Sequence, residues 1–123
     1  MVDQGTKLTR AIEFMKHDTH FRLEKTVLDI VGEKAFSKVV IAFLKDFASV
    51  QQLSDVSMSQ QEKKAFCHKL KSAAGNIGAV NLSMYANETD AELLNDNVDV
   101  SFVLTELNIV ISILSQYFYV DKN

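Results

Sequence analysis

The sequence predicts an all-α fold, specifically an antiparallel four-helix bundle with additional short N-terminal helices. The 123-residue chain has no proline and four glycines, so few positions force a break in a long helix. Four long segments carry apolar residues at spacings of three and four, which is the pattern of one buried helix face. The breaks between these segments are short, as expected for neighbouring antiparallel helices.

Two shorter helices are expected before the bundle, over residues 5–16 and about 21–31, with Gly32 after the second. Residues 1–20 are then a helical N-terminal extension, and residues 21–123 form the bundle domain. The apolar residues of the first helix are Leu8, Ala11, Ile12 and Met15. Those of the second are Leu23, Val27, Leu28, Ile30 and Val31.

The four long helices are expected over residues 33–53, 60–77 and 79–94, and from Asn97 or Asp99 to the C-terminal region. The residues predicted to point inward in the first of these helices are Phe36, Val40, Phe43, Phe47 and Val50. Those of the third helix are Leu82, Tyr85, Ala86, Thr89 and Leu93. Those of the last helix are Val100, Leu104, Leu107, Ile111, Leu114 and Phe118.

Serines mark the start of the helix at residues 60–77. Ser59 with Glu62 has the spacing of a capping box, in which each side chain bonds the backbone N–H of the other residue. Ser57 with Gln60 has the same spacing and competes for the role.

A histidine lies on the outer side of this helix. At about 3.6 residues per turn, the buried face is made by Phe66, Leu70, Ala73 and Ile77, with Cys67 and Ala74 beside them. His68 lies opposite that face and should be exposed to solvent. Its neighbours one or two turns away are Lys64, Lys71, Ser72 and Gly75.

An exposed neutral imidazole is a nucleophile that can accept a phosphoryl group on nitrogen. The product gains a charge of about −2, which Lys71 and Lys64 could offset. Ser72 and Gly75 leave room for a partner to close over the ring, although Gly75 also lies near the helix end. The other interpretation is that His68 is an ordinary residue of a solvated face.

These residues resemble the histidine phosphotransfer domains of two-component phosphorelays, as found at the C-terminus of hybrid sensor histidine kinases. The family pattern is His-x-Leu-Lys-Gly-x-Ala-x-x-x-Gly-Ala. This chain matches it at His68, Leu70, Lys71, Ala74, Gly78 and Ala79, with Ser72 in place of glycine. The resemblance extends over about residues 21–119, where Thr89 replaces the family's leucine and Asp90 its glutamate.

The resemblance implies a phosphocarrier. His68 would accept a phosphoryl group from a receiver-domain aspartate and pass it to the aspartate of another receiver. Such a domain is not itself an enzyme, although it can be part of a sensor histidine kinase. It has no ATP site and no cofactor of its own, and the receiver supplies Mg²⁺. The alternative is a helical protein-interaction module without phosphoryl transfer.

We expect the receiver to dock around His68, and the carrier to be a monomer. The expected docking residues are Lys69, Ser72 and Gly75, together with Lys45 and Ser49 on the preceding helix.

Composition excludes several other classes. The apolar fraction of 47% and the charged fraction of 24% are ordinary for a soluble domain. A net charge of −3 disfavours nucleic-acid binding, and no run approaches the roughly 20 apolar residues of a membrane span. Cys67 is the single cysteine and residues 1–5 lack a signal-peptide core, so we expect a cytoplasmic location. The domain would be free there or part of a membrane-anchored hybrid kinase.

His17 and His20 could begin a metal site, but no third ligand is evident, so no metal is expected. Asp18 or Thr19 is expected to cap a helix instead. Cys67 should be an inert packing thiol. The aromatic residues Tyr117, Phe118 and Tyr119 should pack on the bundle.

Overall fold

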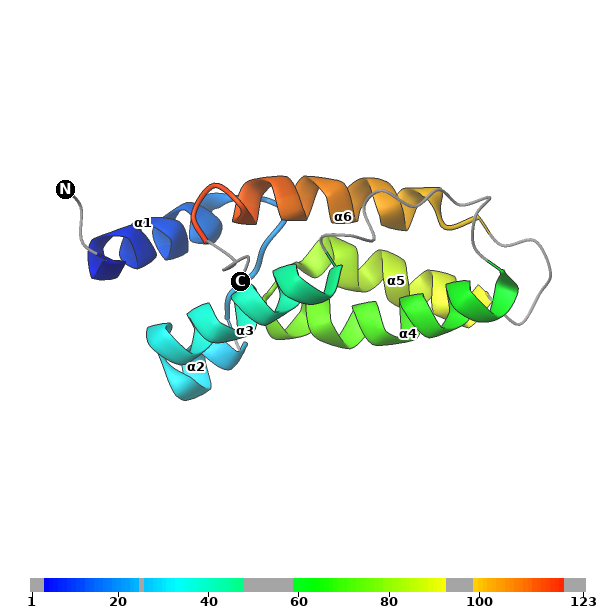
Figure 1. The fold of residues 1–123 in the computed structure, drawn as a ribbon, viewed down its shortest axis with the longest axis horizontal. Coiled ribbons are helices and arrows are strands. Elements are labelled where there is room, and N and C mark those ends of the chain that lie inside the picture. The colour runs from blue at the N-terminus through cyan, green and yellow to red at the C-terminus, as the bar shows by residue number, and fades with distance from the viewer. Residues whose placement is uncertain (1–3, 25, 48–58, 93–98, 119–123) are drawn as a thin grey trace.

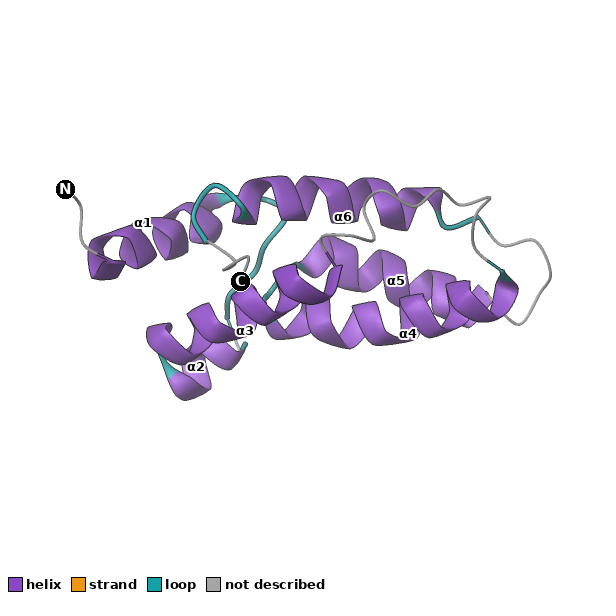
Figure 2. Ribbon diagram, in the orientation of Figure 1, coloured by secondary structure: helices purple, strands orange, loops and turns teal. Residues whose placement is uncertain are grey.

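The computed structural model describes residues 4–24, 26–47, 59–92 and 99–118, and within these ranges all regular secondary structure is helical (Figures 1 and 2). The predicted all-α class is therefore confirmed. The helices are α1 (Gln4–His17), α2 (Val27–Val31), α3 (Glu33–Phe47), α4 (Gln60–Asn76), α5 (Val80–Glu92) and α6 (Ser101–Leu114). No helix of the described residues is both long enough and apolar enough to cross a membrane.

The longer helices pack around one apolar core. α4 lies beside α5 along most of its length, α5 and α3 both contact α6, and α3 also contacts α4 (Figure 1). All six inward residues predicted for the last helix are buried. Of the inward residues predicted in α3, those from Phe36 to Phe47 are buried, whereas Val50 lies outside the described residues.

The N-terminal helix α1 contributes to the same core, because Ala11, Ile12 and Met15 are buried. The Phe14 ring lies 5.2 Å from the Tyr117 ring, which joins α1 to the turn after α6. The helix predicted over residues 5–16 is confirmed. The domain boundary after residue 20 stays a prediction.

The second predicted helix is wrong in its first half, because α2 begins only at Val27. Thr26 caps it: its hydroxyl accepts from Leu28 N at 3.2 Å and donates to Leu23 O at 2.6 Å. The backbone of His20 and Arg22, which was predicted to lie in or next to this helix, instead forms hydrogen bonds with the segment that connects α4 to α5. Arg22 N donates to Gly78 O at 2.6 Å, and Val80 N donates to His20 O at 3.1 Å.

The capping box at Ser59 and Glu62 is confirmed, with both bonds at 3.1 Å. Ser57 lies outside the described residues. The buried face of α4 is rotated relative to the prediction: Lys63, Cys67, Leu70 and Ala74 are buried along the helix, whereas Phe66 and Ala73 are half-buried at its flank. At this flank the Phe66 ring makes an edge contact with the Phe47 ring of α3, with the two ring centres 6.3 Å apart.

Gly78 makes the turn that brings α5 back along α4. Its φ of +75° lies in the left-handed region, which side chains rarely adopt. A Cβ atom at this position would lie 2.5 Å from Arg22 O, which no packing adjustment short of a backbone shift relieves. The turn also bonds Ala79 N to Ala74 O at 2.9 Å. Glycine at this position therefore fixes the relative placement of α4 and α5.

Candidate functional site

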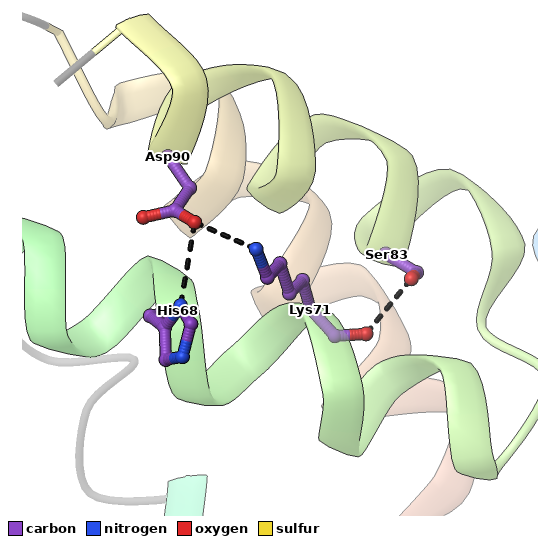
Figure 3. Close-up of polar contacts among 4 residues, drawn as sticks. All are labelled: His68, Lys71, Ser83 and Asp90. Atoms are coloured by element: carbon purple, nitrogen blue, oxygen red, sulfur yellow. Dashed lines mark hydrogen bonds and ion pairs between the residues drawn. The ribbon is translucent and has the colours of Figure 1, made fainter. Parts of the chain in front are cut away.

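His68 lies in the middle of α4 with 72% of its side chain exposed, as the sequence predicts. It points away from the core face that Cys67 and Leu70 bury. The ring leans toward α5, where it meets the side chain of Asp90 (Figure 3). The imidazole is therefore accessible, and one of its two nitrogens has a partner.

Asp90 of α5 contacts both His68 and Lys71 of α4. Its Oδ2 lies 3.4 Å from His68 Nδ1 and 2.7 Å from Lys71 Nζ (Figure 3). The hydrogen bond from Lys71 is the main reason that the pKa of the Asp90 carboxyl is lowered from its ordinary value, with His68 contributing less. The carboxylate is thus ionised at neutral pH and can only accept hydrogen bonds.

This partner favours one tautomer of the His68 ring. A carboxylate has no proton to give, so the neutral ring bonds to it with the proton on Nδ1. Nε2 then keeps its lone pair, and Figure 3 shows Nε2 on the side of the ring turned away from Asp90. The hydrogen bond between Nδ1 and Asp90 is long at 3.4 Å, so it favours this ring orientation only weakly. The His68 ring therefore keeps freedom to turn.

Lys71 is paired and not a free surface cation. Its ammonium is held by Asp90, with 27% of its side chain exposed, and its main-chain carbonyl accepts from Ser83 Oγ at 2.8 Å. Both bonds tie α4 to α5. Lys64 is exposed on the next turn toward the N-terminus. The role of these two lysines at a phosphoryl group stays a prediction.

The expected docking residues fall on two sides of α4. Lys69 faces α3: its Nζ lies 4.0 Å from Asp46 Oδ2 and 5.5 Å from the centre of the Phe47 ring. Ser72 and Gly75 are exposed and line a pocket together with residues of α5. Lys45 is exposed on α3, and Ser49 lies outside the described residues.

His17 and His20, the pair that could begin a metal site, are not brought together with a third ligand among the described residues. His20 Nδ1 lies 2.6 Å from Oε2 of the buried Glu106 on α6, which gives this histidine a different partner. In the ranges that the structure covers, no group of three His, Cys, Asp or Glu residues could hold a metal ion. The helix-cap prediction for Asp18 or Thr19 is wrong, because Thr26 caps the next helix. Asp18 Oδ1 instead accepts from His20 N at 2.8 Å and closes a turn that includes Thr19.

Cys67 is fully buried, and burial raises the pKa of its thiol to about 11, with the negative charge of Asp90 as the second cause. It is a packing residue, as predicted. Phe118 is buried and Tyr117 is half-buried against Phe14, in agreement with a packing role, whereas Tyr119 lies outside the described residues.

Comparisons of the chain with protein-family models, with curated proteins and with solved structures found no match. Asp90 is a member of the site that has no role in the sequence-based interpretation. The signal that could have identified it is position: His68 and Asp90 are nearly equidistant from the Gly78 turn, and such residues lie side by side in a helical hairpin.

Proposed function

We propose that this protein is a histidine phosphotransfer domain, a phosphorelay carrier in which His68 accepts a phosphoryl group from one receiver-domain aspartate and passes it to another. The observation that carries the proposal is the His68 ring itself. It is mostly exposed, its Nδ1 faces the ionised Asp90, and its Nε2 is turned outward as the nucleophile.

The transfer step balances without a proton leaving the carrier. The Nε2 lone pair of His68 forms the new N–P bond while the O–P bond of the aspartyl phosphate breaks. The aspartate leaves as a carboxylate. The His68 ring, still protonated on Nδ1, becomes a phosphorylated imidazolium whose positive charge lies beside Asp90. The second receiver reverses these events when its own aspartate attacks the phosphorus.

Asp90 and Lys71 have complementary parts in this proposal. The Asp90 carboxylate stabilises the positive ring of the product, because opposite charges attract across 3.4 Å. Lys71 keeps that carboxylate ionised and placed between the two helices. Its ammonium also offsets the charge of about −2 that the phosphoryl group brings.

The fold supports the proposal in its finer form, an antiparallel four-helix bundle of α3, α4, α5 and α6. Each of these helices contacts two of the others, which supports this arrangement. His68 lies on the outside of this bundle, where a folded partner can reach it. We assign the chemistry of activation, including Mg²⁺, to that partner. The domain then works as a monomer in the cytoplasm, alone or within a hybrid kinase.

The test is transfer from a receiver domain charged with radiolabelled acetyl phosphate. The expected label on this protein is stable in alkali and lost in acid, as for a phosphoramidate. His68→Gln should abolish labelling, whereas His17→Gln, at an exposed histidine of α1, should retain it. Equal labelling of His68→Gln and wild type would refute the site. If no receiver from a broad panel labels the wild type, the chain is an interaction module and not a carrier.

A further inference from the structure

The segment that leads from α1 to α2 is bonded to the start of α5. Arg22 N donates to Gly78 O at 2.6 Å, and Val80 N donates to His20 O at 3.1 Å. Because α5 begins at Val80, the His20 carbonyl pairs one of the N–H groups that the first turn of a helix leaves without a partner inside the helix. The main chain of this segment therefore holds the first turn of α5.

The ring of His20 bonds the same segment to α6. Its Nδ1 lies 2.6 Å from Oε2 of Glu106, whose side chain is 8% exposed. Glu106 is the only acidic or basic residue of α6 and shares that helix with a row of buried apolar residues. A carboxyl group in such surroundings needs a hydrogen-bonding partner. His20 is thus a junction, because its carbonyl binds α5 and its ring binds α6.

The junction lies at one end of α5, and the partner of the His68 ring lies near the other end. Asp90 is in the last turn of α5, about 15 Å from Val80 along the helix axis. At that distance, a tilt of α5 by about 5° about its first turn moves Asp90 by about 1.3 Å. The contact of Asp90 Oδ2 with His68 Nδ1 is already long at 3.4 Å, so a shift of this size away from α4 breaks it.

The other contact of Asp90 is less sensitive to such a tilt. Lys71 Nζ lies 2.7 Å from the same carboxylate oxygen, and its ammonium is carried on a flexible stem of four carbons that can follow Asp90. A small movement of α5 therefore separates Asp90 from His68 before it separates Asp90 from Lys71. The property that the junction controls is the proton position on the His68 ring.

We propose that His20 is a positioning residue for the reaction at His68: by joining the first turn of α5 to Glu106 of α6, it holds Asp90 within reach of the His68 ring. This inference rests on the proposed function. It gives the segment between α1 and α2 a part in the reactivity of His68, and it gives His20 no contact with the phosphoryl group, which is bound near the other end of α5.

The experiment compares three variants. The first, His20→Ala combined with Glu106→Leu, removes the junction, and it removes both polar groups together so that no buried carboxyl group is left unpaired. His20→Asn keeps a side-chain N–H close to the position of Nδ1 and should restore the junction. Ser59→Ala is the control, because it weakens the fold at the end of α4 that lies far from the junction. Urea unfolding shows that each protein is folded.

Two measurements report the contact between Asp90 and His68. Nitrogen-15 NMR at about pH 8, above the range in which imidazole ordinarily titrates, gives the fraction of His68 rings with the proton on Nδ1. Labelling by radiolabelled phosphoramidate, a small donor, gives the reaction rate without a partner protein. We expect the first variant to lower the Nδ1-protonated fraction to that of Asp90→Ala and the rate up to about threefold. His20→Asn and Ser59→Ala should match the wild type.

Dependence on Asp90 separates positioning from a general loss of structure. If His20 acts through Asp90, removing the junction should have no further effect in an Asp90→Ala background. An additive effect there, or a wild-type ring and rate in the first variant, would overturn the inference. An equal loss in Ser59→Ala would also overturn it, because the ring would then respond to stability alone.

Failure of the proposed function has a different signature. If the His68 ring responds as expected but neither phosphoramidate nor any receiver labels it, the proposed function is wrong and the role of His20 in the reaction is wrong with it. The NMR result would then leave only a structural link from His20 to Asp90.

Discussion

Asp90→Asn tests the electrostatic part of the mechanism, because it removes a charge next to His68 and keeps an oxygen that can accept from Nδ1. In the phosphorylated carrier the ring is positive, 3.4 Å from Asp90 Oδ2. The ring is 72% exposed, so water screens the pair strongly. At a dielectric constant of about 80, two unit charges at this distance attract by about 1.2 kcal/mol. Losing this attraction shifts the transfer equilibrium away from phosphorylated His68 by at most about eightfold.

The rate should change less than the equilibrium. The transition state of phosphoryl transfer is loose, so the ring carries only part of its final charge when the barrier is crossed. If half of the charge has developed, the forward rate falls about threefold. Rapid-quench measurements of transfer from a phosphorylated receiver, run to equilibrium, give both quantities. An equilibrium that is unchanged, or shifted toward phosphorylated His68, would refute the assignment of Asp90.

Lys71 requires a control, because the same carboxylate holds its ammonium at 2.7 Å. In Asp90→Asn this ammonium is released and can approach the phosphoryl group, which offsets part of the loss. A double-mutant cycle with Lys71→Met separates the two contributions. We expect Asp90→Asn to cost more in the Lys71→Met background than in the wild type. A smaller cost there would show that Lys71 acts only through Asp90.

Three further predictions concern the scaffold. Gly78→Ala should lower the free energy of unfolding by more than about 2 kcal/mol in urea titration, because the left-handed φ and the Arg22 carbonyl both oppose a Cβ; a loss below about 0.5 kcal/mol would contradict this. Ser59→Ala should remove the capping box of α4 and cost about 1 kcal/mol, whereas an unchanged urea midpoint would show that the cap is dispensable. The Cys67 thiol ionises near pH 9 when unfolded and near 11 when folded, so between these values the unfolded state loses its proton first and stability falls relative to Cys67→Ala. Parallel stability curves for the two proteins above pH 9 would contradict the buried, protonated thiol.

Local patterns in the sequence predicted the parts of the fold that local interactions determine. The α6 stripe from Val100 to Phe118 and the capping box at Ser59 follow from helical periodicity and from a bond between residues three apart. The exposure of His68 follows from the same phase argument. These features need no knowledge of which helices are neighbours.

The features that were predicted wrongly or not predicted at all depend on contacts between distant segments. The apolar spacing of residues 21–31 suits a helix, but Arg22 is bound to Gly78 across the chain, and Thr26 starts the helix late. Glu106 occupies a buried position on α6 because His20 pairs with it. The role of Asp90 likewise depends on the α4–α5 turn, which places it beside Lys71 and His68. Helical periodicity identifies which face of a helix is buried, but it does not identify which distant residues contact that helix.

The central claim is that Nε2 of His68 is the phosphoacceptor, and nitrogen-15 and phosphorus NMR of the phosphorylated protein tests it most directly. After transfer from a receiver, the account predicts one phosphorylated histidine, with phosphorus coupled to Nε2 of His68 and the proton retained on Nδ1. That result follows from the Asp90 contact at Nδ1 and the outward Nε2. Phosphorus coupled to Nδ1, or phosphorylation of His17 or His20 in place of His68, would contradict it.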